Sequence, residues 1–121
     1  MVDPPPRRGE IFVADLDPIE GREQRGRRPF LVLSIGAMNR APKNLVIGLP
    51  LTTTEWPSNN LHVRIEPGES GLSRVSYAMP EMVRSISTER FRGHIGRAKR
   101  DAYELASNRA GFLIGLGTTK F

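Results

Sequence analysis

A densely charged stretch between two apolar runs sets the first constraint on the fold. The thirteen residues from Asp17 to Pro29 include four arginines, three acids, two glycines and two prolines. No protein core could hold this composition, because a buried charge without a partner costs several kcal/mol. The flanking runs, residues 9–14 and 30–34, are short and rich in β-branched and aromatic side chains, as strands are. The sequence therefore predicts an exposed loop, Asp15 to Pro29, between two strands.

Five further segments have the character of short strands. They are residues 45–51, 61–66, 75–79, 82–86 and 93–96. In residues 61–66 the apolar side chains alternate with polar ones, so His62 is expected to face solvent. Pro50 cannot donate a backbone hydrogen bond, which predicts that its strand lies at an edge or is bulged there.

A helix is expected from Ala98 onward, ending near Gly115 or Gly117. Its apolar residues recur at helical spacing. They are Ala102, Leu105, Ala106, Phe112, Leu113 and Leu116. Arg109 falls within this stripe, so it must extend its charged end to the surface or meet an acid. Short strands followed by one amphipathic helix predict a mainly β (α+β) chain, a small antiparallel barrel with a C-terminal helix. We expect one domain over residues 9–117, a flexible segment 1–8 and a tail 118–121.

Charge and composition narrow the function classes. The net charge is +5, and residues 84–100 alone carry six basic side chains and one acidic one. This predicts either a face for an anionic partner or a solvated basic surface. The absence of cysteine excludes disulfides, thiolate nucleophiles and cysteine-ligated zinc. Residues 1–8 lack the apolar core of a signal peptide, and no run is long enough for a membrane span, so a cytoplasmic protein without a membrane partner is expected.

Few catalytic chemistries fit the remaining residues. His62 and His94 are the only histidines and have no second ligand at metal-binding spacing, so no metal is expected. His94 is expected at the surface, with a phosphate contact as the alternative. An arginine such as Arg28 can hold two phosphate oxygens, and a carboxylate such as Glu23 can act as a base. From the residues alone, a salt-bridged surface loop remains the simpler explanation of Glu23 and its neighbours.

The order of the residues is more specific than their chemistry. The pattern is Arg8-Gly9-Glu10, Asp15-Leu16-Asp17-Pro18, and Gly21-Arg22-Glu23-Gln24-Arg25-Gly26-Arg27-Arg28-Pro29, followed by a Val/Leu-rich strand. It resembles the amino-terminal half of the MazF/PemK toxins, the ribonuclease partners of type II toxin–antitoxin modules. The resemblance extends from about Arg7 to Leu116.

The resemblance implies an SH3-like, MazF/CcdB-like barrel and a homodimer. It implies an endoribonuclease that cleaves single-stranded RNA without a metal or other cofactor. Arg28 and Thr52 match the family's catalytic pair, and Glu23 is the third candidate, as base or RNA contact. The implied reaction is attack by the 2′-OH, which leaves a 2′,3′-cyclic phosphate and a 5′-OH end. The implied protein partner is an antitoxin with an acidic, flexible tail.

The residues expected to bind RNA are Gln24, Arg25, Arg27, Asn39, Thr53, Glu81 and Arg84. Arg25 and Arg27 make the loop more basic than is usual in the family, which should strengthen its attraction to the RNA backbone. The sequence departs from the family pattern at Met82, where a glutamine that takes part in base recognition is expected. Trp56 is expected either to stack on a base or to pack at the rim of the barrel.

Two other functional classes of protein are compatible with this fold. One is a toxin that poisons gyrase by binding it through the C-terminal helix, and the other is an RNA-binding barrel without activity. A gyrase poison would not need the Glu-Gln-x-Gly-x-Arg-Pro loop and its threonine, so the motif favours the ribonuclease.

Overall fold

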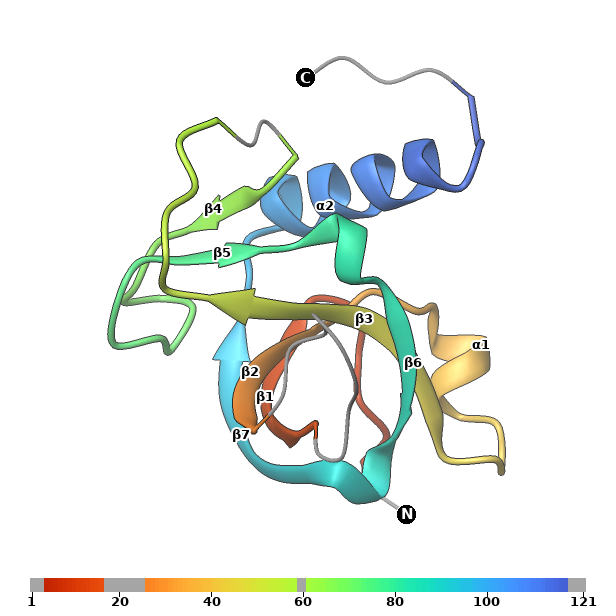
Figure 1. The fold of residues 1–121 in the computed structure, drawn as a ribbon. Coiled ribbons are helices and arrows are strands. Elements are labelled where there is room, and N and C mark those ends of the chain that lie inside the picture. Colours follow the sequence, from red (N-terminus) through yellow and green to blue (C-terminus); the bar gives the residue numbers. More distant parts are fainter. Residues whose placement is uncertain (1–3, 17–25, 59–60, 118–121) are drawn as a thin grey trace.

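The computed structural model describes residues 4–16, 26–58 and 61–117 (Figure 1). Its elements are β1 (Glu10–Asp15), β2 (Arg27–Val32), α1 (Gly36–Asn39), β3 (Leu45–Thr52), β4 (Val63–Ile65), β5 (Ser76–Ala78), the 3-10 turn η1 (Pro80–Met82), β6 (Arg84–Ser87), the 3-10 turn η2 (Thr88–Arg90), β7 (Phe91–Arg97) and α2 (Arg100–Leu113). All strand pairings are antiparallel. The predicted mainly β fold with a C-terminal helix is confirmed.

The sheet is strongly curled. Its strand order is β4-β5-β3-β2-β1-β7, and β6 pairs with β3. Strands β6 and β7 therefore lie far apart in this order, yet only the three residues of η2 connect them along the chain. Such a short link requires the sheet to bend round on itself, which gives the half-barrel seen in Figure 1.

Strand β3 lies in the middle of the sheet, whereas the strand that contains Pro50 was expected to lie at an edge or to be bulged there. One edge of β3 pairs with β2, while the other pairs first with β6, up to Gly48, and then with β5, from Leu51. Pro50 lies where β6 gives way to β5, and its carbonyl accepts a 3.2 Å hydrogen bond from the N–H of Met79. The proline thus occupies an interior strand at a point where its partner strand changes.

Two apolar clusters lie on opposite faces of the sheet. One contains Phe12, Phe30, Val46 and Ile86 inside the curl. The other is covered by α2, whose buried residues are Tyr103, Ala106 and Ala110. The predicted apolar stripe is therefore correct only in part: Leu113, the last residue of α2, is 42% exposed, and Leu116, which follows the helix, is 67% exposed.

The predicted loop between the first two strands is shorter than expected. Asp15 belongs to β1, Leu16 is fully buried, and residues 27–29 belong to β2. The N–H of Leu16 donates a 3.0 Å hydrogen bond to the carbonyl of Gly26, which closes the base of the loop.

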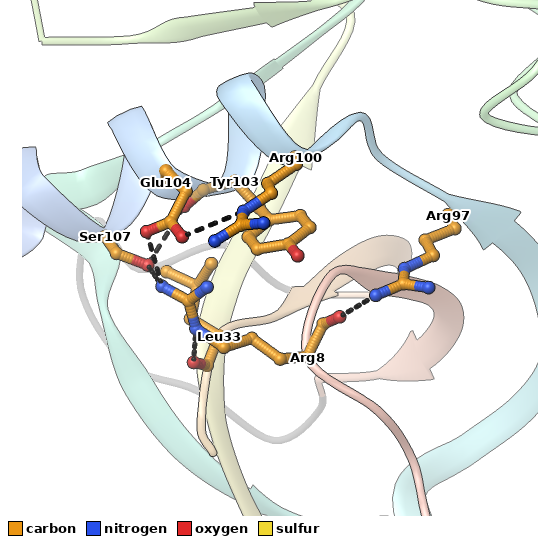
Figure 2. Close-up of polar contacts among 7 residues, drawn as sticks. All are labelled: Arg8, Leu33, Arg97, Arg100, Tyr103, Glu104 and Ser107. Carbon is orange, nitrogen blue, oxygen red and sulfur yellow. Dashed lines mark hydrogen bonds and ion pairs between the residues drawn. The ribbon is translucent and has the colours of Figure 1, made fainter. Parts of the chain in front are cut away.

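The chain before β1 is fastened to the fold as far back as Pro6, which is buried. The Arg8 guanidinium donates to the carbonyl of Leu33 at 3.0 Å and to Ser107 Oγ at 2.8 Å, and it pairs with Glu104 at 3.3 Å (Figure 2). It also lies over the Tyr103 ring, 4.8 Å from the centroid. The expectation of a flexible segment over residues 1–8 did not include these contacts of Arg8. Residues 1–3 and 118–121 lie outside the described residues.

Gly48 is expected to tolerate no side chain. A Cβ there would lie 2.0 Å from the carbonyl oxygen of Leu31 and 2.7 Å from the Phe30 ring. We expect Gly48→Ala to lower the free energy of unfolding by about 3 kcal/mol or more in urea denaturation. Gly111→Ala is the matched control, because its Cβ would meet only Leu116 at ordinary contact distance, 3.6 Å. It should raise stability by up to about 1 kcal/mol. Equal effects of both changes would contradict the close approach at Gly48.

The Arg8–Glu104 contact predicts a pH effect on stability. The hydrogen bond and charge of Arg8 lower the pKa of Glu104 below its ordinary value of 4.5. A carboxylate whose pKa is lower in the folded protein stabilises the fold above that ordinary value and loses this effect as the pH falls. Glu104→Gln should therefore make the urea midpoint less sensitive to pH between 5 and 3 than in the wild type. Unchanged sensitivity would show that Arg8 does not act on this carboxylate.

Candidate functional site

The two residues expected to form a catalytic pair lie on neighbouring strands. The β2–β3 register pairs Phe30 with Pro50 and Leu31 with Leu49. This register ends at Phe30 and Pro50. Arg28 lies two residues beyond Phe30 on β2, and Thr52 lies two residues beyond Pro50 on β3, so both lie towards the same end of this strand pair. Each is two residues from a directly paired residue, so both side chains project to the same face. The fold thus brings together residues separated by 24 positions in the sequence.

Thr52 lies at the end of β3 and is 8% exposed. Its Oγ1 accepts a 3.1 Å hydrogen bond from the N–H of Thr54. A hydroxyl that accepts one hydrogen bond still has its own hydrogen to donate. Arg28 is half-buried on the neighbouring strand. The pair therefore offers a guanidinium fork and an O–H donor at the same end of two paired strands, which is a combination suited to phosphate oxygens.

The strand register extends this pair into a row across the sheet. Thr52 pairs with Tyr77 of β5, and Tyr77 pairs with Arg64 of β4. Arg28 pairs on its other side with Ala14. Sequence reasoning missed Tyr77 and Arg64 as site candidates, because only the register between distant strands places them beside Thr52. The only sequence signal for Arg64 was the alternation of apolar and polar residues in 61–66, which indicates that Arg64 faces away from the apolar side chains.

Three other predicted RNA-binding residues lie at accessible positions on these strands. Arg27 is exposed and pairs across β1–β2 with Asp15. Thr53 is exposed directly after β3. Arg84 pairs with Gly48, four residues before Thr52 along β3, which places it about 13 Å away on the same face. Glu23, Gln24 and Arg25 lie outside the described residues.

Glu81 is joined to His62, which corrects the expectation that His62 faces solvent. The His62 side chain is 4% exposed, and its Nε2 lies 2.7 Å from a carboxylate oxygen of Glu81. It precedes β4 and does not continue the alternation of that strand, and the Trp56 ring lies 5.5 Å from the imidazole. Trp56 itself is 48% exposed. Arg109 donates to the His62 carbonyl at 2.9 Å.

Asn39, which was predicted to bind RNA, is buried and makes structural contacts. Its side chain is buried, and its amide donates 3.0 Å hydrogen bonds to the carbonyls of Pro6 and Ser34. Its amide oxygen accepts a hydrogen bond from Ser34 Oγ. The side chain fastens the residues before β1 to the end of β2, and contact with a bound RNA would require breaking these bonds.

The basic segment does not form one continuous face. Arg90 donates to the backbone of Asp15, and Arg92 pairs with the carboxylate of Asp15. Arg97 and Arg100 lie instead near Arg8 and α2 (Figure 2). His94 lies at the surface as predicted, 51% exposed and 2.9 Å from Glu10. The +5 charge of residues 84–100 is thus distributed over several parts of the molecule.

A cleft of about 780 Å³ lies between β4, the turn that follows it and the start of α2. Val63, Ile65, Ala102 and Leu105 supply its apolar lining. Its charged residues are Arg64, Glu66, Glu69, Lys99, Asp101 and Arg109. The two signs balance, so the charge of this cleft gives no preference for an acidic ligand.

Comparisons with known proteins identify relatives of this chain. Residues 7–111 match the family described as PemK-like, MazF-like toxin of type II toxin–antitoxin system. The chain is 36% identical over 104 residues to endoribonuclease MazF9 of Mycobacterium tuberculosis, covering 83% of this chain and 86% of that protein.

Two solved structures from Deinococcus radiodurans share the fold. The crystal structure of MazF superposes with a TM-score of 0.78 at 28% identity, over 93% of this chain and 98% of that one. A MazE–MazF complex superposes with a TM-score of 0.72 at 28% identity, over 93% and 97%. Within the part of this chain that the structure describes, no helix is long and apolar enough to cross a membrane.

The position of Asn39 predicts a loss of stability without a loss of function. Asn39→Ala would leave the buried Ser34 hydroxyl and the Pro6 carbonyl without this partner, which should cost about 1–3 kcal/mol in urea denaturation. RNA cleavage or binding, measured well below the unfolding midpoint, should stay near that of the wild type. A variant of full stability with weakened RNA binding would restore Asn39 to the RNA surface.

Proposed function

The chain belongs to the PemK-like, MazF-like toxins of type II toxin–antitoxin systems, and from that premise we propose that it is an endoribonuclease acting on single-stranded RNA. The observation that supports this proposal is that Arg28 on β2 and Thr52 on β3, both within the residues that match the family, lie towards the same end of two paired strands. The endoribonuclease MazF9, at 36% identity, supports the same activity.

We propose that Arg28 binds two non-bridging oxygens of the scissile phosphate. These oxygens gain negative charge as the nucleophile adds, so a fixed guanidinium stabilises the transition state more than the ground state. Thr52, at the same end of the strand pair, donates its hydroxyl hydrogen to the same phosphate and fixes its orientation. The half-buried position of Arg28 and the low exposure of Thr52 strengthen both interactions, because less water competes for them.

The proposed nucleophile is the 2′-OH of the RNA, so the protein need not supply one. The 2′-oxygen forms a bond to phosphorus as the bond to the 5′-oxygen breaks. The proton leaves the 2′-OH, and another is delivered to the departing 5′-oxygen. The products are a 2′,3′-cyclic phosphate and a 5′-OH end, with no metal or other cofactor. Glu23 is proposed either to accept the first proton or to contact the RNA.

We further propose that this toxin acts in the cytoplasm as a homodimer and is held inactive by a cognate antitoxin. The solved complex of MazE with a MazF of the same fold supports an antitoxin partner. An acidic, flexible antitoxin segment would compete with RNA for Arg27, Arg28 and Arg84, which line the same sheet. Binding of this kind is expected to weaken with salt.

The proposal predicts loss of cleavage when either member of the pair is removed. Arg28→Ala and Thr52→Val should lower the rate of cleavage of a long single-stranded RNA in EDTA by about 10²–10³-fold. Arg28→Lys should restore little of the rate, because an ammonium lacks the two-pronged geometry of the guanidinium.

Arg27→Ala is the matched control, since it removes an exposed arginine from the adjacent position of β2. It should weaken RNA binding and leave the rate at saturating RNA near that of the wild type. Sequencing the new ends should show 5′-OH termini. Absence of cuts by the wild-type protein in EDTA, or wild-type rates for both Arg28→Ala and Thr52→Val, would overturn the proposed function.

A further inference from the structure

The row that begins at Arg28 continues beyond Thr52 with two residues to which the mechanism gives no role. Thr52 pairs with Tyr77, and Tyr77 with Arg64. Directly paired residues project to the same face of a sheet. The neighbouring row of Leu51, Ala78 and Val63 belongs to the core that α2 covers. Because successive residues alternate between faces, Thr52, Tyr77 and Arg64 project to the face opposite Leu51, Ala78 and Val63, although Arg64, on the edge strand β4, also borders the cleft beside α2.

Exposure increases along this row. Thr52 is buried, Tyr77 is half-buried, and the Arg64 side chain is 56% exposed. Neighbouring strands lie about 4.8 Å apart, so Arg64 lies about 10 Å from Thr52. The row therefore runs from the proposed scissile phosphate outward across the sheet to the solvent.

Arg64 is held in place by one contact and keeps further hydrogen-bond donors. Its Nε donates to the carboxylate of Glu66, and both terminal nitrogens of a guanidinium remain as donors in that arrangement. The hydrogen bond and charge of Glu66, with smaller contributions from Tyr77 and Glu55, raise the pKa of Arg64 above its ordinary value. The side chain is thus a permanent cation next to Tyr77.

We propose that Tyr77 and Arg64 form an RNA subsite beside the scissile phosphate, in which the tyrosine ring stacks on a base and the guanidinium binds a flanking phosphate. This inference rests on the proposed ribonuclease function and specifies how the substrate crosses the sheet. A strand of RNA fixed at Arg28 and Thr52 passes over Tyr77 towards Arg64. Base stacking on an aromatic ring and an arginine on the backbone are the two contacts that bind single strands without a strong sequence preference.

The subsite can be tested by binding, independently of cleavage. The probe is a single-stranded RNA of mixed sequence whose 2′-hydroxyls are all methylated, so that it has no nucleophile. An arginine that binds one phosphate of a single strand contributes about 0.7 to the slope of log affinity against log salt. Arg64→Ala should therefore reduce the steepness of this slope by about that amount. Arg100→Ala is the matched control and should keep the wild-type slope, since Arg100 is also an exposed arginine with one glutamate partner but lies on α2.

Tyr77 is tested by two replacements. Tyr77→Leu should weaken binding of the probe roughly 5- to 100-fold, as expected for the loss of one stacked base. Tyr77→Phe keeps the ring and should bind like the wild type. In cleavage of unmodified RNA, Tyr77→Leu and Arg64→Ala should raise KM and leave kcat within about threefold of the wild type, unlike changes at Arg28 or Thr52.

The outcomes separate the subsite from the proposed function. Identical salt slopes for Arg64→Ala and Arg100→Ala would overturn the phosphate contact, and equal losses in Tyr77→Phe and Tyr77→Leu would overturn the stacking. If the wild-type protein makes no cuts but the Arg64 and Tyr77 effects on binding persist, the ribonuclease assignment fails and the RNA-binding row stands. If the protein cleaves RNA while these variants behave like the control, the row fails and the function stands.

Discussion

Strand β3 is the element on which the rest of the structure depends, because it pairs along both edges. It binds β2 on one side and, on the other, β6 followed by β5. This exchange of partners requires a backbone that can pass closely against Leu31, which Gly48 permits, and a position that needs no donor, which Pro50 occupies. The same strand carries Thr52 at its end. The residues that shape the barrel and the residue that contacts the substrate in the proposed mechanism thus lie within five positions of one another.

The parts of the fold that follow from local pattern could be predicted from the sequence. Short apolar segments between Pro and Gly gave the strands, and the motif around Arg28 gave the family. The burial of the His62 and Asn39 side chains was not predicted, because each is held by a residue distant in sequence: His62 by Glu81, and Asn39 by Pro6. The row of Thr52, Tyr77 and Arg64 could not have been found either, since it depends on the register of three strands, and the alternation of residues 61–66 indicates only that Arg64 faces away from the apolar positions.

Charged residues in this protein pair with nearby elements, and the excess of basic side chains is not gathered on one face. Asp15 contacts Arg90 and Arg92, and Glu104 contacts Arg8 and Arg100. Acids therefore hold several of the arginines to neighbouring elements, and these pairs belong to the scaffold. Among the described residues, the cations assigned to RNA lie on the strands and are few: Arg27, Arg28, Arg64 and Arg84. The net charge alone would have suggested a larger RNA-binding surface than the proposal uses. The position of each arginine distinguishes those with structural contacts from those proposed to bind RNA.

The network around Arg8 affects how the protein can fold during its synthesis. It joins the start of the sheet to Glu104 and Ser107 on the last helix, 96 and 99 residues later. During synthesis the strands emerge first, and their apolar face, which includes Leu31 and Leu49, has no cover until α2 follows. Contacts so distant in sequence also slow the search for the native state. The pairing of β7 with β1 and the cover that α2 provides therefore both wait until residues 91–113 have been made.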